Sequence, residues 1–71
     1  MKRPREPAEV GKILRELRGI RTMTGAAREI GISYSMLTKL EYGIKVPGEG
    51  LKKRLADYYG KSADEIFYTD E

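Results

Sequence analysis

The sequence predicts an all-α protein, a compact bundle of four to five short helices. Two observations support this fold class. Apolar residues recur at the three- and four-residue spacing of a helix face through most of the chain, and glycines or hydroxyl residues separate one such stretch from the next. No segment alternates apolar and polar residues as a half-buried strand does. A chain of 71 residues also has room for a single domain only.

The first helix is expected over residues 7–18, after a flexible basic arm at residues 1–7. The arm contains two prolines, three basic side chains and one apolar residue, so it cannot build a core. Pro7 suits the first position of a helix, and Glu9 favours the positive end of the helix dipole. The domain itself is then expected over residues 8–68, followed by a tail at residues 69–71. One apolar stripe on this helix comprises Val10, Ile13, Leu14 and Leu17.

Two further short helices are expected between capping residues. Thr22 can cap the second helix and Gly31 can end it, whereas Ser33 can cap the third and Gly43 can close it. Gly25 weakens the second helix, which therefore needs tertiary support. The apolar positions are Met23, Ala26, Ala27 and Ile30 in the second helix and Met36, Leu37 and Leu40 in the third.

A turn at residues 45–48 precedes a fourth helix that is expected to end at Gly60. Its apolar positions are Leu51, Leu55, Tyr58 and Tyr59. Ser62 and Glu65 then have the spacing of a capping box, which opens a last turn. The apolar residues of this turn either complete the monomer core, the interpretation we favour, or form a homodimer interface; they are Ile66, Phe67 and Tyr68.

The composition excludes most enzyme chemistries. The chain has no cysteine and no histidine, which removes disulfides, thiolate or imidazole metal sites, and the common nucleophile systems. The carboxylates are scattered along amphipathic helices without a matched pocket. We therefore expect no enzyme, no metal, no cofactor and no small-molecule substrate. Because no apolar run is long enough to span a membrane and no signal peptide follows Met1, the expected location is the cytoplasm.

The charge is unevenly distributed along the chain. Residues 1–54 carry a net charge of +7, whereas residues 55–71 carry −4. A basic body favours polyanionic partners, although such an imbalance also serves solubility. Two short helices joined by a glycine turn describe a helix-turn-helix, whose second helix enters the DNA major groove. The same pair of helices also occurs in helical bundles where it serves only packing. The basic charge of the chain is what favours DNA binding over a packing role.

Several segments together resemble the Xre or Cro/repressor helix-turn-helix family. The resemblance covers roughly residues 10–67 and implies a phage-repressor-like fold and a transcriptional regulator that usually binds operator DNA as a dimer. Three features depart from the family pattern: a short loop after the first helix, Gly25 in place of a polar residue, and Lys52 where an apolar residue is frequent. The matching segments are Arg21-Thr22-Met23, Ala26-Ala27, Gly31-Ile32-Ser33, Leu37, Leu40-Glu41-Tyr42-Gly43 and Pro47.

The helical wheel and the resemblance together predict which residues contact DNA and which form a structural ion pair. Glu41 lies at the rim of the apolar side of the third helix, where the family pairs it with an arginine; Arg18 is the expected partner and Arg15 its rival. The opposite side of that helix is expected to face DNA, or else to be only a solvated surface. The expected base contacts are Tyr34, Ser35, Thr38 and Lys39. The expected phosphate contacts are Arg21, Thr22, Arg28, Ser33, Tyr42 and Lys45.

The sequence thus predicts sequence-specific binding of double-stranded DNA by a transcriptional repressor that occupies an operator. A homodimer would let two recognition helices meet successive major grooves, although the sequence does not determine the oligomeric state. The alternative is a protein-interaction module, such as an antitoxin or an antirepressor-like partner, on the same fold. The arm residues Lys2, Arg3 and Arg5 either belong to a free terminus, the interpretation we favour, or bind DNA by following the phosphates or entering a minor groove.

Overall fold

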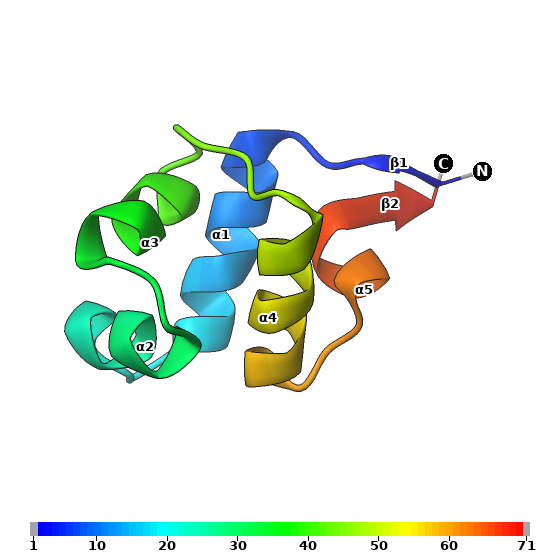
Figure 1. Cartoon of the computed structure of the whole chain (residues 1–71). Helices are drawn as coiled ribbons and strands as arrows, with labels where there is room; N and C mark the ends of the chain where they lie inside the picture. Colours follow the sequence, from blue (N-terminus) through cyan, green and yellow to red (C-terminus); the bar gives the residue numbers. More distant parts are fainter. Residues whose placement is uncertain (1, 71) are drawn as a thin grey trace.

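Helix α1 lies at the centre of the molecule, between the α2–α3 pair on one side and α4 with α5 on the other (Figure 1). The computed structural model describes residues 2–70, and its helices confirm the expected all-α fold. Among these helices, none has the length and hydropathy that a membrane span needs. The elements are β1 (Lys2–Pro4), α1 (Pro7–Arg18), α2 (Met23–Ile30), α3 (Tyr34–Glu41), α4 (Glu49–Tyr59), α5 (Ala63–Phe67) and β2 (Tyr68–Asp70).

Both caps of α2 and the N-cap of α3 are the residues that the sequence indicated, whereas the C-cap of α3 is Tyr42 and the expected Gly43 follows it. The Thr22 Oγ1 accepts a hydrogen bond from the Gly25 amide at 2.9 Å, and the Ser33 Oγ accepts one from the Met36 amide at 3.0 Å. Both satisfy amides that lack a partner within the first helical turn. Gly31 ends α2 in the left-handed region, with φ at 91°. These contacts fix the short connection between α2 and α3.

The core draws side chains from every helix. Leu14 of α1, Leu37 of α3 and Leu55 of α4 are completely buried, and Ile66 and Phe67 of α5 are buried beside them. The favoured interpretation of the C-terminal turn, as part of the monomer core, agrees with this burial for both α5 residues. The buried residues of the hydrophobic core cluster are Val10, Leu14, Ala26, Ala27, Ile30, Leu37, Leu40, Leu55, Ala56, Ile66 and Phe67.

A two-stranded ribbon is the main feature that the sequence did not indicate. Strand β1 pairs antiparallel with β2, so that Lys2 lies opposite Asp70. The Lys2 Nζ also lies 2.6 Å from a carboxylate oxygen of Asp64. Residues 2–4 are therefore paired in this structure, not free as the expected flexible arm would be. Both strands have only three residues. Strand β1 is exposed and contains Pro4, and β2 is only partly buried, so no apolar alternation marks them in the sequence. Residues 1 and 71, which belong to the expected arm and tail, lie outside the described residues.

Candidate nucleic-acid interface

Helices α2 and α3 form a helix-turn-helix at the end of the molecule opposite the β1–β2 ribbon (Figure 1). The turn between them is short because Gly31 reverses the chain directly after α2. The amides of Gly31 and Ile32 both donate to the Ala27 carbonyl, at 2.9 and 3.0 Å. These bonds satisfy the end of α2 while Ser33 already caps α3. Helix α3 is therefore held at a defined angle to α2.

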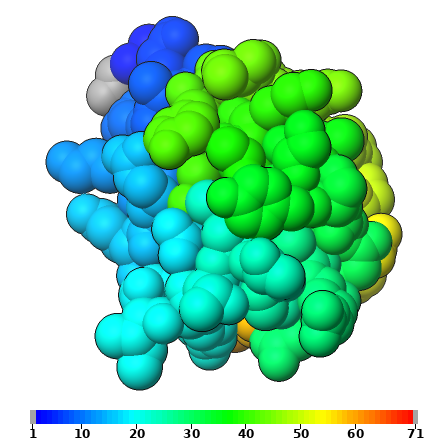
Figure 2. All heavy atoms as spheres, turned by 90° about the vertical axis from the view of Figure 1, so that its left-hand side faces the viewer, coloured from blue at the N-terminus to red at the C-terminus, as the bar shows by residue number. Residues whose placement is uncertain are grey.

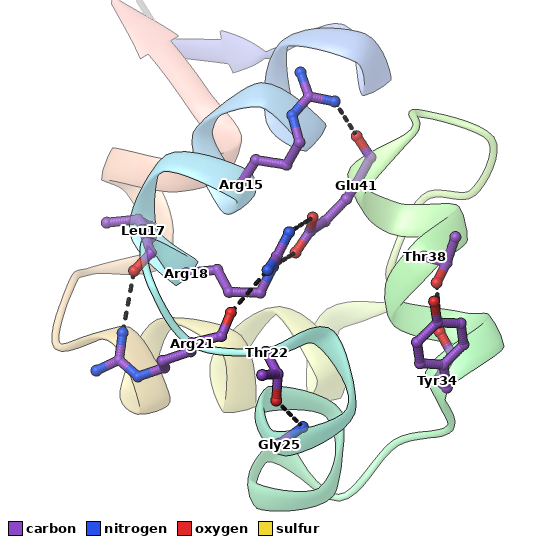
Figure 3. A network of polar contacts seen from close by, with 9 residues as sticks. All are labelled: Arg15, Leu17, Arg18, Arg21, Thr22, Gly25, Tyr34, Thr38 and Glu41. Atoms are coloured by element: carbon purple, nitrogen blue, oxygen red, sulfur yellow. Dashed lines mark hydrogen bonds and ion pairs between the residues drawn. The ribbon is translucent and has the colours of Figure 1, made fainter.

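The inner side of α3 is anchored by apolar contacts and by one buried ion pair. Glu41 is only 1% exposed, and its two carboxylate oxygens accept hydrogen bonds from Arg18 Nε at 2.8 Å and Nη2 at 3.0 Å (Figure 3). This hydrogen bonding raises the pKa of Arg18 above its usual value. Arg15, the rival partner, donates instead to the Glu41 backbone carbonyl at 3.3 Å. Two arginines of α1 thus hold the last residue of α3.

Gly11 allows α1 to approach α3 more closely than any other residue type would. A Cβ atom at this position would clash with the Glu41 carbonyl and would lie 3.0 Å from the Leu40 carbonyl oxygen. The two helix backbones are therefore in direct contact beside the ion pair. The sequence contained one indication of this contact, because a glycine inside a helix costs about 1 kcal/mol relative to alanine and needs a packing reason.

The outer side of α3 presents the candidate base-contacting residues to solvent. Ser35 and Lys39 are exposed, and Tyr34 retains 57% of its accessible surface. Thr38 is half-buried, and its hydroxyl donates to the Tyr34 carbonyl at 2.8 Å (Figure 3). The proton of this hydroxyl is therefore already used, which leaves the Thr38 methyl group and the oxygen lone pairs for other contacts. Figure 2 shows this face, with the green surface of α3 at its centre and that of α2 below it.

Most of the candidate phosphate contacts lie around α3. Tyr42, 65% exposed, is the C-cap of α3, and the exposed Lys45 lies in the loop that follows. Arg28 is exposed in the last turn of α2. Thr22 and Ser33 are exposed caps at the N-termini of α2 and α3, where the dipole favours an anion. Positive groups and helix N-termini therefore surround the outer side of α3.

Arg21 has a different environment from the other candidates. Its guanidinium carbon lies 5.4 Å from the ring centroid of Tyr58 and 5.8 Å from that of Tyr59, and its Nη1 donates to the Leu17 carbonyl at 3.2 Å. The side chain is therefore packed between the end of α1 and the end of α4. Arg21 is nevertheless exposed, and a phosphate contact by its guanidinium stays a prediction. The sequence did not indicate this packing because Tyr58 and Tyr59 are distant along the chain.

Lys52, which departs from the family pattern, has a side chain that is only 15% exposed. Its ammonium nitrogen lies 5.0 Å from the Tyr68 ring centroid and 5.7 Å from that of Phe67. It also donates to the Tyr68 hydroxyl at 3.1 Å, a bond that is the main cause of the raised pKa of Lys52. The lysine therefore attaches β2 to α4 where an apolar side chain would pack.

The comparison with family models agrees with this geometry. A model described as helix-turn-helix matches residues 12–66, which include α2, the turn and α3. A search of curated proteins finds no match to the chain. Because the matched segment is most of the chain, and because the fold and the α2–α3 geometry agree with it, the protein belongs to the helix-turn-helix family of Xre- and Cro-type DNA-binding regulators.

Proposed function

We propose that the protein is a sequence-specific transcriptional repressor that occupies an operator by placing α3 in the major groove of double-stranded DNA. The observation that carries the proposal is the two-sided character of α3. Its inner side is fixed by Leu37, Leu40 and Glu41, while Ser35 and Lys39 on the outer side are exposed. A rigid helix with an unoccupied polar side of this kind suits the dimensions of the major groove.

The outer side chains have distinct capacities for reading bases. The Lys39 ammonium can donate to guanine O6 and N7, and the Ser35 hydroxyl can donate or accept. Since the Thr38 proton is used within α3, its methyl group is suited to an apolar contact with a thymine methyl. Tyr34 offers a phenol at the start of the helix. We infer that discrimination depends mostly on Lys39, which brings a charge as well as donors.

The remaining candidates would bind the phosphates that flank α3. Arg28 and Lys45 supply charge on either side of the recognition helix, and Tyr42 supplies a hydroxyl. Thr22 and Ser33 mark helix N-termini that favour phosphate oxygens. These contacts position the protein on any duplex and carry no sequence information.

The positive charge around α3 supports the same orientation on DNA. Arg28, Lys39 and Lys45 are exposed on or beside α3, and basic side chains attract the phosphate backbone. At the opposite end of the molecule (Figure 1), the carboxylates of Asp64 and Asp70 lie beside Lys2 of β1, so that charges of both signs are present there.

A homodimer is part of the proposal. Two copies would place their α3 helices in successive major grooves, roughly 34 Å apart. Because Ile66 and Phe67 are buried in the core, the interface would have to use other residues. Analytical ultracentrifugation with and without a palindromic duplex would establish whether two copies assemble on one site.

The test of the function is a salt series of duplex affinities measured by fluorescence anisotropy, on a duplex selected from a random pool and on an unrelated one. We expect both affinities to fall steeply with salt. Lys39→Ala should relax the preference for the selected duplex, and Arg28→Ala should weaken both affinities alike. Binding without salt dependence, or without a preference for any duplex, would contradict the proposal and favour a protein partner.

A further inference from the structure

Arg54 of α4 reaches the turn of the helix-turn-helix. Its Nη2 donates to the Ile30 carbonyl at 2.6 Å and to the Gly31 carbonyl at 3.1 Å. These carbonyls belong to the last residue of α2 and to its C-cap, where the helix leaves carbonyls without partners and where its dipole attracts a cation. One guanidinium nitrogen thus binds the two carbonyls at which the chain turns from α2 towards α3.

Gly31 is adapted to this contact as well as to the turn. Its φ of 91° already favours glycine. In addition, a Cβ at this position would overlap the Arg54 Nη2. Because Nη2 is the far end of a flexible side chain, a larger residue at position 31 would displace the guanidinium from the two carbonyls. Gly31 therefore leaves the space that Arg54 occupies.

A second side chain of α4 holds the same turn of α2. The Tyr58 hydroxyl, one helical turn after Arg54, donates to a carboxylate oxygen of Glu29. Arg54 and Tyr58 together bind three consecutive residues, 29–31, at the end of α2. Helix α4 therefore fixes the direction in which the chain leaves α2.

We propose that Arg54 is a positioning residue for the recognition helix, acting by binding the carbonyls of Ile30 and Gly31. This inference rests on the proposed function, since the position of α3 matters for reading bases. Without the guanidinium, the turn gains freedom and α3 samples more orientations against the groove. Contacts with bases need defined geometry, whereas attraction to phosphates does not. Loss of Arg54 should therefore reduce the preference for the selected duplex more than it reduces binding to DNA in general.

The chain offers a matched control for charge. Lys53, the preceding residue of α4, is exposed, and its side chain makes no hydrogen bond or ion pair within residues 2–70. Lys53→Ala and Arg54→Ala each remove one positive charge from the same helix. If Arg54 contributed only charge, the two variants would bind every duplex equally.

The first measurement compares these variants at a temperature at which circular dichroism shows both to be folded. We expect Arg54→Ala to lose about tenfold in the ratio of specific to non-specific affinity, consistent with loss of charge-assisted hydrogen bonds. Lys53→Ala should keep the ratio of the unmodified protein, with both affinities lowered alike. Equal ratios in the two variants would overturn the proposal.

The second measurement needs no DNA and uses Gly31. Gly31→Asn should lower the urea midpoint more than Gly60→Asn, because Gly60 has a similar left-handed backbone with no atom near its Cβ position. In an Arg54→Ala background, Gly31→Asn should cost no more than Gly60→Asn does. Equal costs in both backgrounds would show that Arg54 does not bind the turn. If the unmodified protein prefers no duplex, the proposed function fails. The comparison of unfolding midpoints in the two backgrounds still decides whether Arg54 fixes the turn.

Discussion

The two sides of α3 differ in what determines their residues. On the inner side, Leu37, Leu40 and Glu41 are almost completely buried against α1 and the core. On the outer side, Tyr34 and Tyr42 are more than half exposed. Substitution of the inner residues should therefore change stability, and substitution of the outer residues should change binding. The comparison shows how one short helix is held firmly while it leaves a surface for DNA.

The largest effect is expected from Glu41→Ala on the inner side. This substitution leaves the Arg18 guanidinium without its carboxylate partner, which costs about 3–5 kcal/mol for a buried pair. Urea unfolding monitored by circular dichroism measures the loss. Glu16→Ala, which removes an exposed carboxylate from α1, is the control and should change stability by less than about 0.5 kcal/mol. Similar losses in the two variants would contradict the structural importance of the pair.

Gly11→Ala should cause the next largest change in stability, and its sign should be opposite to that of Gly50→Ala. The added methyl group meets the Glu41 carbonyl, so we expect a loss of about 1–3 kcal/mol from overpacking. Gly50→Ala in α4 has open space and should gain up to about 1 kcal/mol from helix propensity. Thermal unfolding of the two variants checks both signs. A stabilised Gly11→Ala variant would show that α1 and α3 do not touch there.

On the outer side, Lys39→Ala should leave stability within about 0.5 kcal/mol while removing roughly 1–3 kcal/mol of base discrimination. The exposed Lys39 contributes to no core contact, so the two effects are separable. Lys61→Ala removes the same charge between α4 and α5 and serves as the control for non-specific attraction. Competition between the selected and unrelated duplexes measures discrimination. An equal loss in both variants would mean that Lys39 contributes only charge.

Tyr59→Phe should have the smallest effect at neutral pH. The Tyr59 hydroxyl is buried without a hydrogen-bond partner among residues 2–70, so its removal should be neutral or stabilise by up to about 1 kcal/mol. Burial raises the pKa of Tyr59 to about 12. The folded state keeps this proton more tightly than the unfolded state does. The titration of Tyr59 therefore leaves the free energy of unfolding unchanged below about pH 10 and lowers it as the pH rises from 10 through 12.

Urea unfolding at pH 7, 10 and 11 tests this assignment. The unmodified protein should lose stability above pH 10 more steeply than Tyr59→Phe does. Tyr58→Phe is the contrasting variant, because it removes a hydroxyl that donates to Glu29 and should be destabilising at pH 7. Parallel pH dependence in the unmodified protein and in Tyr59→Phe would contradict the burial of the phenol.

Local features of the fold could be predicted from the sequence, whereas most contacts between distant segments could not. The Arg18–Glu41 ion pair is an exception, and it was expected from the family resemblance. Thr22, Ser33 and Gly31 are helix caps, and each acts only on residues that are close to it in the chain. These helix boundaries therefore followed from residue type. Gly11 and Arg54, in contrast, have roles that come from contacts with backbone carbonyls in other parts of the chain. Nothing in their local sequence identifies those carbonyls.

The same distinction applies to the candidate site and to the terminal ribbon. The helical wheel separated the outer side chains of α3 from the buried ones, because a helix with one apolar stripe leaves the opposite side in solvent. The wheel did not indicate that Arg21 packs on Tyr58, since that contact joins the α1–α2 loop to α4. The pairing of Lys2 with Asp70 joins the two ends of the chain and has no periodic pattern.

The most direct test of the account is an NMR titration of the ¹⁵N-labelled protein with the selected duplex at low salt. The amides of Ser35, Thr38 and Lys39 should shift most, together with those of Arg28 and Lys45, while the amides of α5 and β2 should hardly change. The largest shifts on α5 and the β1–β2 ribbon, with α3 unaffected, would contradict the assignment of α3 as the recognition helix.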